Sequence, residues 1–276
     1  MSAVLQTTTP QLTRIELQPR IATELKVDPT TLLSGGIAAE IRVLLEQRGV
    51  VVVREINLTD EQQIAFTRTL GPLIGDGIAK ITIDPAENKM GNYIRGAFFW
   101  HIDGTMLQAP IGAAVLTARR LAANGGDTEF CNTYAAYDEL TATDKARIDN
   151  LKVVHSIENT QRYLNPEPTY AELEEWQRFP DRILPLVWKH RSGRKSLVLG
   201  NTATYVVGMG QRESSALLTR LRDWATQPQF VYRHKWKVGD MVIWDNTGTM
   251  HRATHYDLHS GRMMHRTQTA GDEPLS

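Results

Sequence analysis

The feature that most limits the fold of this chain is a series of short β-rich segments that begins beyond Gly71. Each segment is rich in β-branched and aromatic residues, and turn-forming residues separate it from the next. Many short strands with few helices between them are typical of a sandwich or barrel. The expected strands are 80–83, 112–120, 128–131, 151–156, 184–190, 196–199, 229–236, 241–244, 249–256 and 263–269.

Helical patterns flank these strands. Aliphatic residues recur at helical spacing over 37–47, and a β-branched strand is expected to follow at 50–56. Thr59 opens a capping box, which predicts a helix that ends at Gly71-Pro72. Further helices are expected at about 134–149 and 211–226. The chain is therefore predicted to be mainly β with flanking helices, in one domain over residues 1–276.

Residues 159–180 form a long connection between two expected strands. The segment is aromatic, acidic and contains proline, and it shows no clear secondary-structure pattern. Connections of this length are usually functional or mobile. Two interpretations remain open, a lid over an active site and a surface insert that contacts another subunit.

The charge and cysteine content exclude several classes of protein. Lys and Arg number 31, as do Asp and Glu, so the formal net charge is zero. A neutral chain lacks the field expected of a nucleic-acid binder or a membrane-surface protein. Cys131 is the single cysteine, so no intrachain disulfide forms. The sequence shows no signal-peptide pattern and no apolar run long enough to cross a bilayer, which favours a cytoplasmic protein.

A histidine followed two residues later by an aspartate occurs twice, at His101 with Asp103 and at His255 with Asp257. Residues i and i+2 share a face in a strand, so either pair would present two ligands to one metal ion. Two histidines and one carboxylate leave coordination positions open, as in non-haem Fe(II) oxygenases. The pattern alone arises by chance in a chain this rich in histidine, and the third ligand must come from elsewhere.

His251 is the favoured third ligand because of the segment that follows it. Residues 249–269 are interpreted as a strand, a turn and a strand, with a hairpin centred near 258–259. In that register His251 lies opposite Arg266, and His255 lies opposite Arg262. Two guanidinium groups beside a histidine suit a bound carboxylate. An equally compatible interpretation places both arginines at the surface, paired with acids such as Asp257 or Glu273.

Four motifs, taken together, resemble those of one enzyme family, the taurine dioxygenase and phenoxyalkanoate (2,4-D type) dioxygenase family of Fe(II)/2-oxoglutarate enzymes. The resemblance extends over most of the chain, from the segment at 48–52 to Gly271-Asp272. Each motif is weak alone, but their order and spacing together are specific. The motifs are Trp100-His101-Ile102-Asp103, Gly125-Gly126-Asp127-Thr128, Trp244-Asp245-Asn246 shortly before His251, and Arg262-Met263-Met264-His265-Arg266.

The resemblance implies a double-stranded β-helix (jelly-roll) core with Fe(II) on His101, Asp103 and His251. It implies that Thr128 and Arg262 hold the distal carboxylate of 2-oxoglutarate. Arg266 is expected near the metal, touching either the inner carboxylate of the co-substrate or an anionic group of the substrate. The second pair, His255 and Asp257 in His255-Tyr256-Asp257, is then expected to have a structural role and not to bind metal.

The resemblance also implies a reaction. O2 and 2-oxoglutarate are consumed, succinate and CO2 are released, and an sp3 carbon of the substrate is hydroxylated. Asp103 stands where a halogenating enzyme would need a small residue, which favours hydroxylation. Relatives cleave ethers, C–N or C–S bonds in this way, and they are often dimers or tetramers.

The substrate is expected to be a small organic acid with an aromatic or alkyl body. The run Gly96-Ala97-Phe98-Phe99 departs from the polar pattern of sulfonate-using relatives, and Met106 lies just beyond the metal motif. Phe98, Met106 and Arg266 are therefore candidate substrate contacts, although Phe98 is equally compatible with a place in the core. Two alternatives to an oxygenase are a jelly-roll enzyme that uses another divalent metal for hydrolysis or isomerisation, and a binding protein that has lost turnover.

Overall fold

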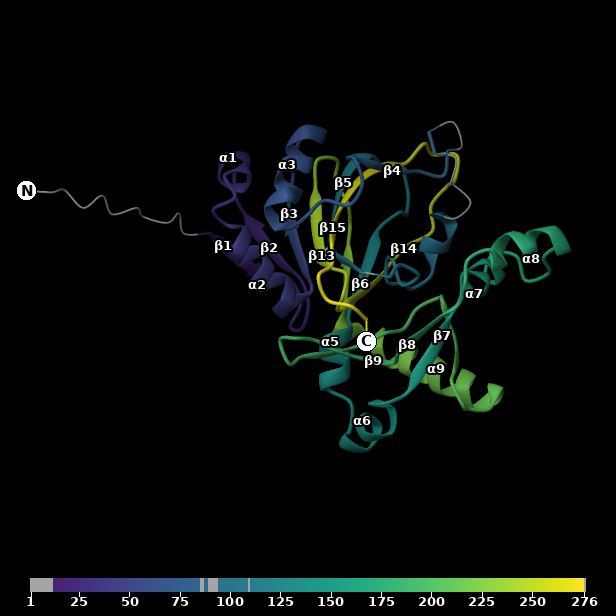
Figure 1. Ribbon diagram of the computed structural model, residues 1–276. Coiled ribbons are helices and arrows are strands. Elements are labelled where there is room, and N and C mark those ends of the chain that lie inside the picture. The colour runs from purple at the N-terminus through teal and green to yellow at the C-terminus, as the bar shows by residue number, and fades with distance from the viewer. Residues whose placement is uncertain (1–11, 85–86, 89–93, 109, 276) are drawn as a thin grey trace, which may run out of the picture.

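The computed structural model describes residues 12–84, 87–88, 94–108 and 110–275 (Figure 1). Its largest element is a seven-stranded sheet, in which β2 and β3 are parallel and the other neighbours are antiparallel. In spatial order the strands are β1 (Thr13–Glu16), β2 (Thr23–Lys26), β3 (Val50–Val53), β13 (Met241–Asp245), β5 (Ile111–Arg120), β15 (Met263–Ala270) and β4 (Ala79–Ile81).

A second, three-stranded antiparallel sheet packs against the first. Its order is β12 (Val231–His234), β6 (Thr128–Asn132) and β14 (Thr249–Ala253). Between the two sheets lies an apolar core in which the Phe130 ring of β6 and the Trp244 ring of β13 are 5.5 Å apart between centroids. The two facing sheets form the predicted jelly roll, and the gap between them at one end holds the site described below.

Helices cover the outer face of the large sheet, and this explains the unbroken Val50–Val53 run. Val50 and Val52 point into the core between the sheets, whereas Val51 and Val53 pack under the helices. A strand buried on both faces has no need of polar alternation. The covering helices are α1 (Pro29–Leu33), α2 (Ala38–Arg48) and α3 (Asp60–Leu70). The capping box that opens α3 at Thr59 is present, as predicted.

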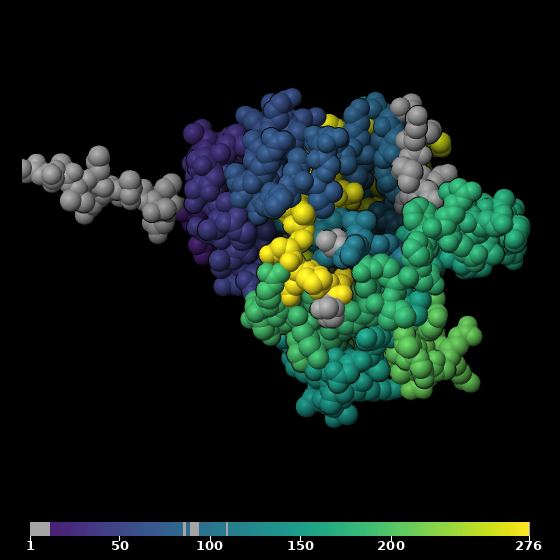
Figure 2. Space-filling view, viewed as in Figure 1, coloured from purple at the N-terminus to yellow at the C-terminus, as the bar shows by residue number. Residues whose placement is uncertain are grey.

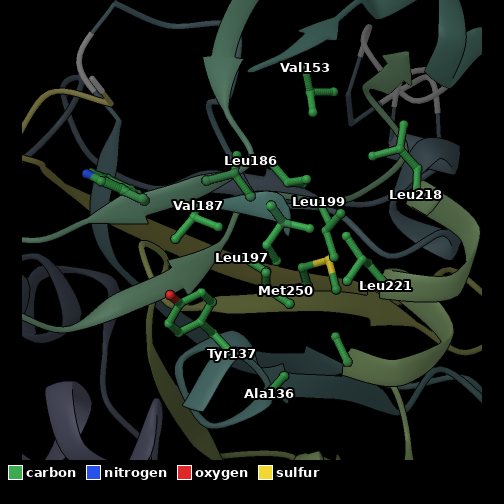
Figure 3. Close-up of a cluster of buried hydrophobic side chains, with 14 of the residues drawn as sticks. Ala136, Tyr137, Val153, Leu186, Val187, Leu197, Leu199, Leu218, Leu221 and Met250 are labelled. Carbon is green, nitrogen blue, oxygen red and sulfur yellow. The ribbon is translucent and has the colours of Figure 1, made fainter. Parts of the chain in front are cut away.

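A long insert between β6 and β12 covers the outer face of the small sheet. Cys131 and Met250 of that face join an apolar cluster with Leu197, Leu199 and Leu221 of the insert (Figure 3). The insert contains α5 (Thr133–Asp138), α6 (Ala142–Ile148), β7 (Lys152–His155), α7 (Ile157–Arg162), α8 (Tyr170–Gln177), β8 (Arg182–Pro185), β9 (Val187–Lys189), β10 (Lys195–Leu197), β11 (Ala203–Val206), α9 (Gln211–Ala225) and the 3-10 turn η2 (Pro228–Phe230).

The structure corrects the expectation that residues 159–180 lack secondary structure. Helices α7 and α8 occupy most of this segment, and a second capping box, Thr169 with Glu172, opens α8. In the space-filling view these helices form a lobe that projects from the body of the molecule (Figure 2). Elsewhere the single helix expected at 134–149 is two helices, and the strand expected at 184–190 is divided at Leu186.

The hairpin expected between 249–256 and 263–269 was wrong. Strand β14 pairs with β6, and β15 pairs with β5 and β4, so Arg266 lies opposite Leu116 and not opposite His251. After Ala253 the backbone bonds to the loop at 125–127, where Thr254 N donates to Asp127 O at 2.8 Å. These bonds carry the chain from the small sheet to the large one, which a tight turn cannot do.

Within the described part of the chain, no helix has both the length and the apolar character needed to span a bilayer.

Candidate metal centre

His101, Asp103 and His251 converge at one end of the gap between the two sheets. Their ligand atoms all lie within 4.8 Å of one another, and among the described residues they form the group able to hold a metal ion. His101 is not inside a strand as expected, because it forms an isolated bridge to His251 of β14, and Asp103 lies in the turn that follows. The second pair, His255 and Asp257, is not part of the group.

The His101 ring is oriented by a main-chain carbonyl. Nδ1 donates to Phe99 O at 2.9 Å, so the proton is held on Nδ1 and the lone pair of Nε2 faces the other two ligands. Nε2 lies 3.5 Å from Asp103 Oδ1. A histidine fixed in this tautomer is ready to bind a divalent cation without rearrangement.

His251 is held by aromatic packing. Its ring centroid lies 4.7 Å from that of Trp244 and 6.1 Å from that of Phe130. Burial, followed by the neighbouring charge of His101, holds the pKa of His251 well below its ordinary value. The ring therefore stays neutral, which is the form that ligates metal.

Asp103 is fixed through its side chain by the large sheet. Arg266 Nη1 and Gln268 Nε2, two residues apart on β15, both donate to Asp103 Oδ2 at 2.8 Å. Burial alone would raise the pKa of Asp103, but the positive charge of Arg266 outweighs it, and the pKa lies well below its ordinary value. The carboxylate is thus ionised, with Oδ1 free of these donors.

The backbone of Asp103 is fixed by Asn246, a completely buried side chain. Asn246 Oδ1 accepts from Asp103 N at 3.0 Å, and Asn246 Nδ2 donates to Asp103 O at 2.8 Å and to Ile111 O at 3.2 Å. Sequence reasoning assigned no role to Asn246 or Gln268. The signals were the Trp244-Asp245-Asn246 motif and the spacing of Arg266 and Gln268, which places both on one face of a strand.

Arg262 is a buried cation whose residue is 5% exposed. The charge of the nearby Asp127 acts on it, but Asp127 forms its salt bridge with Arg233, and among the described residues no salt bridge to Arg262 is found. Nη2 donates to Gly126 O at 2.9 Å, the guanidinium lies 4.9 Å from the Tyr256 ring centre, and Nε has no hydrogen-bond partner in the described structure. A buried arginine is stable when an anion pairs with it. The alternative interpretation, in which Arg262 lies at the surface and pairs with Asp257 or Glu273, is therefore wrong.

Gly126 of the neighbouring loop borders Arg262, and Thr128 follows it by two residues. Gly126 has φ +74, and a Cβ built on it would lie 2.8 Å from Arg262 Nε, so only glycine leaves room for the guanidinium. Thr128, at the start of β6, is 5% exposed, and its hydroxyl accepts from Trp236 Nε1 at 2.9 Å. Because that oxygen accepts, the hydroxyl proton of Thr128 remains available to an anion.

A cavity of about 430 Å³ is lined by His101 and Asp103, two of the three ligands. Met106 and Arg266, the predicted substrate contacts, also line it. Phe98 does not, because its ring packs against His255 at 4.7 Å and Tyr256 at 5.5 Å between centroids. The side chains that give the cavity its apolar character are Ile81, Ile94, Met106, Leu107, Ile111 and Ile157.

Comparison with known proteins agrees with this geometry. The family described as taurine catabolism dioxygenase TauD, TfdA family matches residues 13–268. An alpha-ketoglutarate-dependent 2,4-dichlorophenoxyacetate dioxygenase of Cupriavidus pinatubonensis is 34% identical over 271 residues, which cover 89% of this chain and 93% of the relative. An (S)-phenoxypropionate/alpha-ketoglutarate-dioxygenase of Sphingobium herbicidovorans is 35% identical, over 80% of this chain and 82% of the relative.

The crystal structure of AAD-2 in complex with Mn(II) and N-oxalylglycine superposes with a TM-score of 0.84. That protein is 34% identical, and the match covers 96% of this chain and 99% of the other. Together these matches cover nearly the whole of the described fold. The chain belongs to the TauD, TfdA family and is an Fe(II)- and 2-oxoglutarate-dependent dioxygenase.

Proposed function

We propose that His101, Asp103 and His251 hold the Fe(II), and that Thr128 and Arg262 bind the distal carboxylate of 2-oxoglutarate. The observation that carries this assignment is the buried guanidinium of Arg262, which forms no salt bridge with any described acid. A dicarboxylate co-substrate would satisfy it, whereas a hydrolase or isomerase with the same three ligands has no use for an anion site there. Two nitrogens and one carboxylate oxygen are the donor set that suits Fe(II).

When bound, Fe(II) with 2-oxoglutarate and O2 supplies the oxidising chemistry, and the protein supplies orientation and shelter. Arg266 and Gln268 hold Asp103 Oδ2, so Oδ1 would be free to bind Fe(II). Phe99 O keeps the proton of His101 on Nδ1. The apolar walls of the cavity exclude water from the reacting carbon.

We propose that the substrate is a small, partly apolar organic acid of the phenoxyalkanoate type, hydroxylated at an sp3 carbon. The apolar cavity suits an aromatic or alkyl body, Met106 contributes to that wall, and Arg266 offers a positive charge beside it. Relatives act on phenoxyalkanoates and on sulfate esters. Hydroxylation beside an ether oxygen, a nitrogen or a sulfur gives an adduct that splits, so cleavage would follow.

The test of this function is succinate release from 2-oxoglutarate by the Fe(II)-loaded enzyme under O2. The panel contains phenoxyalkanoates, alkyl sulfonates, sulfate esters and amino acids. Phenoxyalkanoates are expected to raise succinate release well above the level without substrate. Strict preference for alkyl sulfonates or amino acids would overturn the substrate assignment. Hydrolysis or isomerisation with Zn(II) or Mn(II), without 2-oxoglutarate, would favour the alternative function.

We propose further that the whole chain is one domain that acts as a cytoplasmic homodimer or homotetramer, without nucleic-acid or membrane partners. The zero net charge supports the last point. Ile183 of β8 and Tyr205 of β11, which flank Val154 of β7, are 61% and 46% exposed and offer an apolar surface for a second copy. Light scattering coupled to gel filtration tests the oligomer, and Ile183→Glu should dissociate it.

We propose that the 159–180 segment acts as a lid. Thr160 and Gln161, at the end of α7, line the cavity beside the ligands, whereas α8 lies in the projecting lobe (Figure 2). Protection of this segment from protease on addition of Mn(II), N-oxalylglycine and phenoxyacetate would support a lid. Protection that depended on protein concentration alone would favour the subunit contact.

A further inference from the structure

A line of three buried polar side chains runs from the interior of the insert to the cavity. His155, at the end of β7, is fully buried, and its Nδ1 lies 2.8 Å from Thr202 Oγ1. Thr202 Oγ1 lies 3.3 Å from Thr105 Oγ1. Both threonines line the cavity beside the metal ligands, and they are 8% and 3% exposed. No step of the proposed mechanism uses this line.

The direction of these hydrogen bonds depends on the tautomer of His155. Its Nε2 is buried and has no partner among the described residues. A proton on Nε2 would leave a buried N–H unsatisfied, which costs more than leaving a lone pair unpaired. The favoured tautomer therefore carries its proton on Nδ1 and donates to Thr202.

That tautomer leaves one hydroxyl proton free. The two threonines have two hydroxyl protons, and their mutual hydrogen bond uses one of them. Because His155 donates to the pair, the second proton has no acceptor within the line. In the other tautomer, His155 Nδ1 would accept the second hydroxyl proton, and the pair would have no proton left to donate to a ligand. The pair therefore presents one neutral donor to the cavity.

The surroundings hold this arrangement in place. Burial, with the nearby charge of Arg182, lowers the pKa of His155 to about 4, so the ring is neutral at physiological pH. Arg182 Nη1 also donates to Thr105 O at 3.0 Å and to Leu107 O, and these bonds fix the turn that carries Thr105. The cationic side chain of the cavity, Arg266, already donates to Asp103.

We propose that the Thr105–Thr202 hydroxyl pair, oriented by His155, is a specificity element that binds an acceptor oxygen of the substrate. This inference rests on the proposed function and sharpens its substrate class to acids with an oxygen placed to accept this donor, such as the ether or carboxylate oxygen of a phenoxyalkanoate. Thr105 and Thr202 touch the substrate. His155 acts through them and is a positioning residue.

The test measures binding without turnover. The enzyme is loaded with Mn(II) and N-oxalylglycine, and phenoxyacetate is titrated in by calorimetry. Thr105→Val removes the hydroxyl at nearly constant shape and should raise the Kd about five- to tenfold, the worth of one neutral hydrogen bond. Thr105→Ser should keep the Kd near wild type. Thr204→Val is the matched control, because Thr204 donates to Thr202 O but does not line this cavity.

A second probe, 3-phenylpropanoate, has a methylene in place of the ether oxygen. Loss of affinity in Thr105→Val for phenoxyacetate alone would assign the ether oxygen as the acceptor, and equal loss for both probes would assign the carboxylate. Either result supports the inference. An unchanged Kd for both probes would overturn it.

The positioning role of His155 is tested by comparing the Kd values of the single and double variants. His155→Leu should weaken phenoxyacetate binding as Thr105→Val does, and the double variant should be no weaker than either single one. His155→Gln, which retains a donor, should recover most of the affinity and serves if the leucine variant does not fold. Additive losses would show that His155 has only a structural role.

Failure of this inference is distinguishable from failure of the proposed function. If the wild-type enzyme binds neither probe, the phenoxyalkanoate class and this inference both fall. If it binds them and releases succinate, but Thr105→Val behaves as wild type, only the inference falls.

Discussion

The backbones of His101 and His251 hydrogen-bond to each other in both directions. His101 N donates to His251 O at 3.0 Å, and His251 N donates to His101 O at 2.9 Å. This bridge joins the loop that carries Asp103 to strand β14, although the two histidines are far apart in the sequence. The backbone bridge thereby holds the two ring centroids 4.1 Å apart. Preorganisation of this kind lowers the cost of metal binding.

Asn246 should control metal affinity without touching the metal. Asn246→Ala removes three hydrogen bonds that fix the backbone around Asp103. Loss of a group that orients a ligand typically weakens metal binding about 10- to 100-fold, and anaerobic titration with Fe(II) measures it. Asn150→Ala, which removes an exposed amide that bonds to Lys189 and lies outside the proposed lid, is the control. Equal Fe(II) affinity for both variants would contradict the proposed role.

Arg262 should control the KM for 2-oxoglutarate and leave the affinity for Fe(II) almost unchanged. Arg262→Gln removes the buried charge, and we expect the KM for 2-oxoglutarate to rise about 100-fold while Fe(II) affinity changes little. Thr128→Val should produce a smaller rise, because it removes one neutral donor. If Arg266→Gln raised this KM more than Arg262→Gln did, the anchor would be misassigned.

Gly126 tests whether the space beside Arg262 matters. Gly126→Ala incurs the cost of positive φ, roughly 1–2 kcal/mol, and also places a methyl group against Arg262 Nε. Gly193→Ala is the matched control, because its φ is +85 but nothing lies within 4 Å of the added Cβ. Urea unfolding should show a loss of stability in both variants, larger in Gly126→Ala because of the added contact, and only Gly126→Ala should raise the KM for 2-oxoglutarate. A raised KM in both variants would refute the steric argument.

The protein should lose stability as the pH falls from about 6.5 to about 4. Burial lowers the pKa of His155 and of His190 from 6.5 to about 4, so between these values the unfolded chain binds more protons than the folded one. Each histidine contributes up to roughly 3 kcal/mol to this loss, and below pH 4 its contribution becomes constant.

Urea unfolding at pH 7.5, 6 and 5 measures this dependence. His190→Gln should reduce the slope of unfolding free energy against pH, whereas the exposed His259→Gln should leave it unchanged. Identical slopes in the wild type and His190→Gln would show that His190 does not contribute.

Most of the strands could be predicted because their patterns are local, although β1, β2 and β11 were missed. The three converging groups were assigned through the family resemblance, because the hairpin that favoured His251 was wrong. The β-branched run of β3 and the capping box at Thr59 need only neighbouring residues. The route from Ala253 to β15 could not be predicted in this way, because it depends on hydrogen bonds between Thr254 and the loop at 127, far away in the sequence.

The same reason explains the site residues that were missed. Asn246 and Gln268 act on Asp103 across more than a hundred residues, and neither side chain is a metal ligand by type. Phe98 looked like a wall of the cavity because it lies near His101 in sequence, but the short turn η1 (Arg95–Phe98) directs it toward His255. Proximity in sequence was a poor guide wherever the chain turns.

The most direct test of the account is the weak visible absorption band that forms when Fe(II) and 2-oxoglutarate are added without oxygen. The wild type should show the band, His101→Ala and Asp103→Ala should lose it, and His255→Ala should keep it, because His255 lies outside the ligand group. A band that persisted in His101→Ala, or that disappeared in His255→Ala, would contradict the proposed metal centre.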